Sequence, residues 1–240
     1  MNLRIPIEYE DDQLIVINKP AGLLSVPDRY DAELPNALTQ LSQSYGEMRP
    51  VHRLDRDTSG LLCFARSQEA QRSLSQQFEG RSVTKTYLAI VEGIPPIETG
   101  EIDYSLGPHP GKPRQMIVSN RGKEARTVYR ILEPLGRFSL LEVKIFTGRT
   151  HQIRVHLAAV GNPLIVDALY GPRQQLKLSE IKGRRYRANR SGEERPLLSR
   201  QPLHAYTLGF LHPTTNEELS WECEPPKDMR ATVNQLRKWG

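Results

Sequence analysis

Predicted strands and helices are mixed along this sequence without a regular strand–helix–strand rhythm. Leu14-Ile15-Val16-Ile17 is an apolar, β-branched run that predicts a buried strand, and the turn-forming sequence Asn18-Lys19-Pro20-Ala21-Gly22 ends it. Residues 84–91 and 138–146 also alternate as strands do. Because no regular strand–helix–strand repeat links these runs, the sequence predicts an α+β fold with a mixed, mostly antiparallel sheet.

Two helices are expected from apolar residues at helical spacing. The first begins after an N-cap at Ser67 and ends at Gly80, and the second begins after an N-cap at Thr150 and ends at Gly161. Their apolar stripes are Ala70, Leu74 and Phe78 in the first, and Ile153, Leu157 and Val160 in the second.

The length of 240 residues suits one domain, whole or in two lobes. No apolar run approaches the roughly 20 residues of a membrane span, so no membrane partner is predicted. The first ten residues carry Arg4, Glu8 and Glu10 and lack the apolar core of a signal peptide. A cytoplasmic protein is therefore expected.

Positive charge is concentrated in one part of the chain. The net charge is +5, whereas residues 172–200 alone hold nine Arg or Lys and three Glu, a local charge of +6. Pro172 and Pro196 stand near the ends of this segment, which we interpret as a basic insertion, too polar to form core. Clustered cations favour a polyanionic partner. The alternative is a solvated loop that binds nothing.

The densest polar cluster is His52-Arg53-Leu54-Asp55-Arg56-Asp57-Thr58-Ser59-Gly60. Its two carboxylates could form a general acid/base pair, as in glycoside hydrolysis. However, residues 57–60 fit a type I turn with Asp first and Gly fourth, which makes Asp57 structural. Asp55 is then the better candidate for chemistry, and a surface salt bridge is the competing interpretation.

A second polar cluster, Gly148-Arg149-Thr150-His151-Gln152-Ile153-Arg154-Val155-His156, opens the later helix. Such a helix start could hold a phosphate, or Arg154 could meet a buried carboxylate. His151 and His156 are five residues apart, which is the wrong spacing for a shared metal ion, and no metal site is predicted. Tyr87, taken alone, looks like a strand packing residue. The usual motifs of nucleotide, dinucleotide, serine-hydrolase and zinc-protease sites are missing.

Taken together, these clusters resemble the RluA-type pseudouridine synthases. Five blocks stand in the family's order and cover roughly residues 5 to 225. The most specific are H-R-L-D-x-x-T-S-G at residues 52–60 and G-R-T-H-Q-I-R-V-H at residues 148–156. The other three are Asn18-Lys19-Pro20-Ala21-Gly22-Leu23-Leu24, Lys85-Thr86-Tyr87 and Leu203-His204-Ala205.

The resemblance implies a two-lobed fold with a central active-site cleft, formed by residues 1–240 as a single catalytic domain. It makes Asp55 the essential carboxylate, Arg154 its ion-pair partner and Tyr87 the aromatic residue against the target uracil. It also assigns substrate-binding positions to Arg53, Ile153, His52 and Arg149. The small RNA-binding domain of many relatives has no counterpart before residue 14, and the segment between Gly171 and Leu203 is longer than in many of them.

The expected reaction is the isomerisation of uridine to pseudouridine in structured RNA, either ribosomal or transfer RNA. Because both nucleosides contain the same atoms, no cofactor is expected, and a monomer is the default. A buried Asp55 needs an adjacent cation to stay ionised, which Arg154 could supply. Two alternatives stay open, a non-catalytic RNA-binding protein with this fold and a hydrolase that releases uracil.

Overall fold

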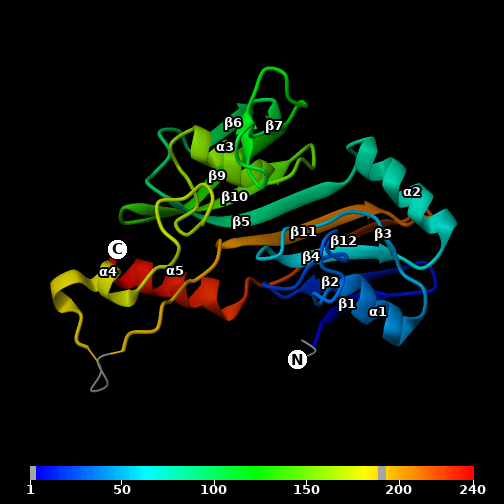
Figure 1. Ribbon diagram of the computed structural model, residues 1–240, viewed down its shortest axis with the longest axis horizontal. Helices are drawn as coiled ribbons and strands as arrows, with labels where there is room; N and C mark the ends of the chain where they lie inside the picture. Colours follow the sequence, from blue (N-terminus) through cyan, green and yellow to red (C-terminus); the bar gives the residue numbers. More distant parts are fainter. Residues whose placement is uncertain (1–3, 189–192) are drawn as a thin grey trace. The chain divides into compact units, whose positions relative to one another are not determined.

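The computed structural model describes residues 4–188 and 193–240, and it confirms the α+β class with a mostly antiparallel sheet. Figure 1 shows the order of strands and helices along the chain. The chain divides into two compact units. Unit 1 comprises Met1–Thr86 and His204–Glu224, and unit 2 comprises Tyr87–Leu203 and Pro225–Gly240. The single domain and its central cleft stay predictions.

Unit 1 is built on a sheet with the strand order β1-β2-β4-β11-β12, and β3 lies beside β4. Its strands pair antiparallel except β4 and β11, which run parallel. The strands are β1 (Ile7–Glu10), β2 (Leu14–Lys19), β3 (Arg49–Pro50), β4 (Ser59–Ala65), β11 (Leu203–Leu211) and β12 (Glu218–Glu222), and the helices are α1 (Ala37–Tyr45) and α2 (Gln68–Glu79).

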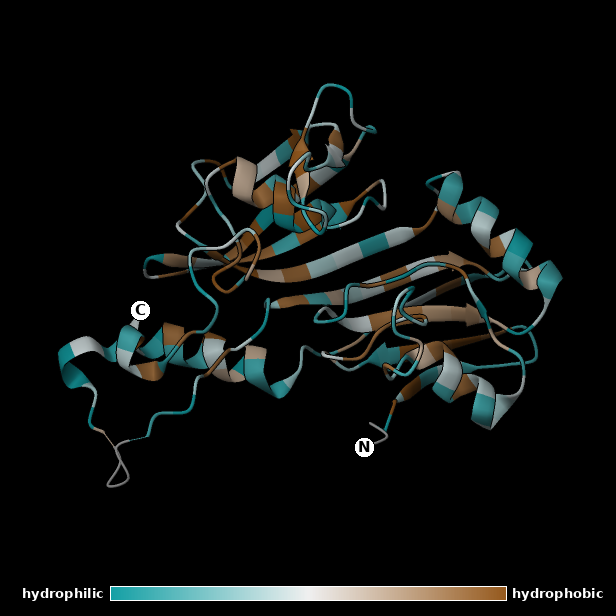
Figure 2. Cartoon of the chain, in the orientation of Figure 1, coloured by the Kyte–Doolittle hydropathy of each residue, from teal (hydrophilic) through white to brown (hydrophobic). Residues whose placement is uncertain are grey.

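The core of unit 1 lies where α2 packs on the sheet. Ala70 and Leu74 of α2 are buried against residues of β2, β4 and β11. Figure 2 shows the resulting mixture of brown and teal along α2, the mark of a helix with one buried face. Burial of one such leucine contributes about 1.5–3 kcal/mol.

Unit 2 contains the sheet order β5-β10-β9-β6, in which β9 pairs antiparallel with both β10 and β6. A separate antiparallel pair is formed by β7 and β8. The strands are β5 (Thr84–Glu92), β6 (Thr99–Asp103), β7 (Leu106–Pro108), β8 (Met116–Val118), β9 (Arg126–Leu135) and β10 (Phe138–Ile145), and the helices are α3 (Gln152–Ala159), α4 (Leu178–Lys182), the 3-10 helix η1 (Gly183–Arg185) and α5 (Lys227–Trp239).

The strongest local signals in the sequence are confirmed. The predicted strands at 14–17, 84–91 and 138–146 correspond to β2, β5 and β10. Ser67 is the N-cap of α2, and its hydroxyl accepts a hydrogen bond from the Ala70 N–H at 3.0 Å. No helix in residues 4–188 and 193–240 is long and apolar enough to span a membrane.

Two local predictions were wrong. The N-cap of α3 is His151, with a left-handed backbone (φ 54°), and not Thr150. The predicted turn at 57–60 lies two residues earlier, because the Thr58 N–H donates to the Asp55 carbonyl oxygen at 3.1 Å, and Ser59 and Gly60 already belong to β4. The turn is displaced because the pairing of Ser59 and Gly60 with neighbouring strands overrides the local turn preference.

The basic segment 172–200 has regular structure in its described part; residues 189–192 lie outside the described residues. It contains α4 and η1. Leu176 and Leu198 face each other in a β-bridge and are 0% and 1% exposed. The prediction that the segment is too polar to contribute core was therefore wrong.

Helix α5 connects segment 172–200 to the sheet of unit 2. Figure 1 shows α4 (yellow) beside α5 (red), and the two helices are in contact. Arg237 on α5 donates to both carboxylate oxygens of Glu133 on β9. At the turn between β9 and β10, Gly136 has a left-handed backbone (φ 68°), and a side chain there would collide with Gly240. The end of α5 is therefore held firmly to unit 2.

Candidate active site

In unit 1, the predicted catalytic carboxylate lies at the start of a tight turn. Asp55 is partly buried, and its carbonyl oxygen accepts the Thr58 N–H. The preceding residue is fixed from outside the loop, because the Ser25 hydroxyl donates to the Leu54 carbonyl at 2.9 Å and accepts the Leu54 N–H at 3.0 Å. Hydrogen bonds to the main chain therefore hold the backbone at Leu54 and at Asp55 itself.

A fully buried lysine ties the first sequence block to this turn. Lys19 at the end of β2 is 0% exposed, and its ammonium donates to the carbonyl oxygens of Pro20, Leu23 and Arg56 at 2.7–3.0 Å. The Arg56 carbonyl also accepts the Gly22 N–H, and the Arg56 side chain donates to the Gly22 carbonyl. Buried polar groups need such partners, so Lys19 has a clear structural role.

The other end of the turn enters β4 against β11. The Ser59 hydroxyl lies 3.0 Å from His204 Nδ1, and His204 Nε2 lies 2.9 Å from the Cys223 carbonyl oxygen. Since that carbonyl can only accept, Nε2 carries the proton and Nδ1 accepts from Ser59. Gly60 has φ +111°, and a side chain there would collide with the backbone of Ala205. The T-S-G sequence therefore permits close β4–β11 pairing.

His52 and Arg53, the other predicted site residues in unit 1, have contrasting surroundings. The His52 ring stacks on Phe78 at 4.5 Å, and its Nε2 accepts the Cys63 N–H at 3.1 Å. Burial and the nearby Lys85 ammonium lower the pKa of His52 to about 3, so the ring is neutral. Arg53 is exposed, and among the described residues its side chain makes no hydrogen bond or ion pair. Substrate binding by His52 and Arg53 stays a prediction.

In unit 2, Arg154 on α3 forms a buried bidentate ion pair with Asp167. Its Nε and Nη2 donate to the two carboxylate oxygens at 2.7 and 2.8 Å, and the two side chains are 7% and 1% exposed. Burial would raise the pKa of Asp167, but hydrogen bonds from Arg154 and from the N–H groups of Leu169 and Tyr170 hold it below its usual value. The predicted pairing of Arg154 with Asp55 stays a prediction.

Gln152 fixes the loop that leads into α3. Its side-chain oxygen accepts from the Thr147 hydroxyl at 2.7 Å and the Arg149 N–H at 3.0 Å. Its amide group donates to the Arg126 carbonyl and the Thr127 hydroxyl, both at 3.0 Å. Every polar group of this 3% exposed side chain is thereby satisfied.

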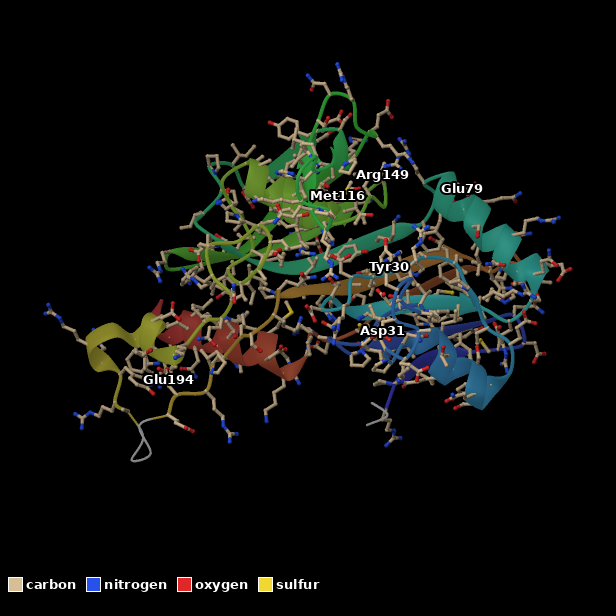
Figure 3. The ribbon with its side chains drawn as sticks, in the orientation of Figure 1. Tyr30, Asp31, Glu79, Met116, Arg149 and Glu194 are labelled. Carbon is tan, nitrogen blue, oxygen red and sulfur yellow. The ribbon has the colours of Figure 1, made fainter. Side chains whose placement is uncertain are left out.

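The other residues of unit 2 that the sequence analysis singled out lie close to this loop or on β5. His151 Nδ1 is 2.8 Å from the Tyr170 hydroxyl, which also accepts the Met116 N–H. Arg149 is partly buried and donates to the Glu124 carbonyl; Figure 3 labels Arg149 and Met116 in this region. Tyr87 and Ile153 are 7% and 3% exposed. Contact of these residues with uracil or RNA stays a prediction.

Known proteins with similar sequences identify the family. Residues 13–159 match the family described as RNA pseudouridylate synthase. The chain belongs to this family. It is 39% identical to the ribosomal large subunit pseudouridine synthase D of Zymomonas mobilis, over 97% of this chain and 73% of that protein. It is 37% identical to the dual-specificity RNA pseudouridine synthase RluA of Pasteurella multocida, over 92% and 93% of the two chains.

A solved structure agrees with this assignment. The human RNA pseudouridylate synthase domain containing 4 superposes with a TM-score of 0.72 at 25% identity, covering 97% of this chain and 93% of that one. RNA pseudouridine synthases are isomerases that convert uridine in RNA, and this chain is a member. The resemblance recognised from the five sequence blocks is confirmed.

Several residues stabilise the site of this synthase in a way that the sequence analysis did not predict. Lys19, Gln152 and His204 stood inside recognised blocks, but each also contacts a group from a distant part of the sequence. Ser25 and Asp167 gave no distinguishing signal, because a buried hydrogen bond depends on the tertiary position of its partner. Among the described residues, no group of three His, Cys, Asp or Glu side chains could hold a metal ion.

Proposed function

We propose that this synthase isomerises specific uridines in structured RNA with Asp55 as its catalytic carboxylate. The observation that carries the proposal is the Asp55 turn, held by Ser25, Lys19 and the Ser59–His204 pair within the family's most specific motif. A fixed backbone at the catalytic carboxylate suits a reaction in which the geometry at one sugar carbon decides the outcome.

The reaction breaks the N1–C1′ bond, turns the uracil and forms a C5–C1′ bond. N1 gains a proton, and C5 loses one. Asp55 can assist by attacking C1′ or by removing the C2′ proton to give a glycal, and both routes stay open. The base must leave its stack to react, and an aromatic contact from Tyr87 would offset part of that cost.

Ribosomal RNA is the first substrate class to test, with transfer RNA second. The name of the Zymomonas mobilis relative specifies the large ribosomal subunit, and that of the Pasteurella multocida relative specifies dual specificity. Wild-type protein is expected to form pseudouridine in one of these RNAs and to release no free uracil. Chromatography of nuclease-digested RNA checks both products. Free uracil would favour a hydrolase, and RNA binding without either product would favour a non-catalytic role.

We further propose that segment 172–200 binds the RNA backbone. Lys182 of α4, Arg185 of η1 and Lys238 of α5 all lie over the Trp239 ring, at 4.9, 5.8 and 5.2 Å. Beside α4 is an open cavity of about 710 Å³, whose cationic lining residues include Arg187. Figure 3 labels Glu194, whose carboxylate accepts the Ser179 N–H of α4 at 2.7 Å. Cations gathered in this way favour phosphate groups.

Neutralising Arg184, Arg185 and Arg187 together to Gln is expected to weaken binding to all RNAs alike. All three are exposed, and phosphate contacts supply affinity without reading sequence. The slope of log affinity against log salt should fall by about 0.7 for each phosphate of single-stranded RNA that is no longer neutralised, or roughly 2 in total. Turnover at saturating RNA should hardly change. Fluorescence titrations at several salt concentrations measure the slope.

A matched triple variant provides the control. Arg49, Arg130 and Arg237 are arginines whose charges are already balanced by Glu47, Glu142 and Glu133. Their replacement by Gln changes the net charge equally, but it should alter the salt slope less. If the two triple variants give the same slope, segment 172–200 is only a solvated surface.

A further inference from the structure

Lys85 is a mostly buried cation for which the described residues provide no anionic partner. It lies on β5 and is 8% exposed. Among the described residues, its ammonium makes no hydrogen bond or ion pair, and it lies over the Phe78 ring, 5.3 Å from the ring centroid. Burial of such a charge is unfavourable unless something compensates it.

Lys19, in the same unit, is a buried lysine with a structural role and can be compared with Lys85. That ammonium is more deeply buried than Lys85, but three carbonyl oxygens accept its hydrogen bonds. Lys85 has, among the described residues, the face of the Phe78 ring, which gives a weaker attraction than an anion would. The difference indicates that the strong partner of Lys85 comes from outside the chain.

The two described side chains that interact with Lys85, Phe78 and His52, carry no negative charge. Phe78 is apolar, and the His52 ring stacked on it is neutral because its pKa is lowered to about 3. Burial also lowers the pKa of Lys85 to about 8, so most of it is still charged at neutral pH. An anion that bound there would restore the pKa and relieve the unfavourable burial.

The position of Lys85 connects it with the candidate active site. His52 belongs to the same loop as Asp55, and its charge state is coupled to Lys85. Strand alternation also places Lys85 on the same face of β5 as Tyr87, the residue proposed to meet the target base. An anion at Lys85 would therefore belong to the substrate.

We propose that Lys85 binds a backbone phosphate of the RNA strand that carries the target uridine. The inference rests on the proposed function, because that function supplies the polyanionic substrate. Phosphate is the anion that such a strand presents at every nucleotide. A compact lysine ammonium suits one phosphate oxygen without demanding the planar geometry of an arginine contact.

The test is Lys85→Met, which keeps most of the apolar stem and removes the charge. RNA affinity is expected to fall about tenfold, the effect of losing one hydrogen bond to a charged group. The salt slope should decrease by about 0.7–0.9, one phosphate contact. The melting temperature should equal or exceed that of the wild type, because an uncompensated buried charge is gone. Lys85→Arg should recover part of the affinity.

Lys144→Met is the matched control. Lys144 also lies over a phenylalanine ring, that of Phe146 at 5.4 Å, but it is exposed. The substitution removes the same charge and the same kind of aromatic interaction, and both affinity and salt slope should change less than in Lys85→Met. Equal changes in the two variants would mean that Lys85 acts only through overall charge, which overturns the proposal.

Three other results would also overturn it. Unchanged affinity with a lower melting temperature would make Lys85 structural. Unchanged affinity with an unchanged melting temperature would leave it without a role in binding. Lower affinity with an unchanged salt slope would indicate contact with the base rather than with a phosphate. If wild-type protein forms no pseudouridine, the proposed function fails, whereas normal wild-type activity with any of these results refutes only the role of Lys85.

Discussion

Asp55→Asn is expected to reduce pseudouridine formation by at least about 100-fold, because an amide can neither attack C1′ nor accept the C2′ proton. Folding should be nearly unchanged. Asparagine is as well suited to a turn as aspartate, and the hydrogen bond from Thr58 involves only the backbone of residue 55. RNA affinity should likewise stay close to that of the wild type. Tritium release from RNA labelled at C5 of uracil measures the reaction.

Asp57→Asn is the control for this prediction. The substitution is chemically identical and lies two residues further along, at an exposed position in the same turn. Its activity should remain within a few-fold of the wild type. Near-normal activity of purified Asp55→Asn, or an equal loss in both variants, would refute the catalytic assignment.

Arg154→Met is expected to destabilise the protein by about 3–5 kcal/mol, because it leaves the Asp167 carboxylate buried without its bidentate partner. Activity should fall as well, since α3 carries Ile153 and follows the loop of Arg149. Denaturant unfolding gives the free energy of unfolding of each variant. Arg149→Met provides the comparison: the side chain of Arg149 donates to the neutral Glu124 carbonyl, so its removal should cost less.

The pH dependence of this destabilisation has a definite sign. In the wild type the pKa of Asp167 is depressed, so its contribution to stability is present at neutral pH and is lost as pH falls through that lowered pKa. In Arg154→Met the carboxylate can relieve its burial by protonation. The difference in stability between variant and wild type should therefore be largest at neutral pH and narrow on acidification.

A double variant, Arg154→Met with Asp167→Asn, separates the charge effect from packing. Removing both charges should restore part of the stability that Arg154→Met loses, because no stranded charge remains. If Arg154→Met unfolds at the same denaturant concentration as the wild type, the ion pair contributes nothing to stability.

Local features of the fold could be predicted because their causes lie within a few residues. Ser67 caps α2 through its own neighbour at Ala70, and β2, β5 and β10 carry the alternation or apolar run that a sheet requires. Predictions failed where a distant strand or helix decided the backbone. His151 takes the N-cap position of α3 in a region where Gln152 joins the chain to Arg126 and Thr127. Leu176 and Leu198 form core because they face each other across 22 residues.

The sequence by itself determined the fold class, the family and Asp55 as the candidate carboxylate, because motifs of defined spacing carry that information along the chain. Only the tertiary structure decided what holds the site in place. Lys19, Ser25, Gln152 and the Arg154–Asp167 pair act through partners that are remote in sequence or are backbone carbonyl groups. A carbonyl group is present at every residue, so the sequence cannot indicate which one a buried side chain will meet. The tertiary structure thus decides whether the ammonium of a buried lysine meets carbonyl groups, as in Lys19, or finds no hydrogen-bond partner among the described residues, as in Lys85.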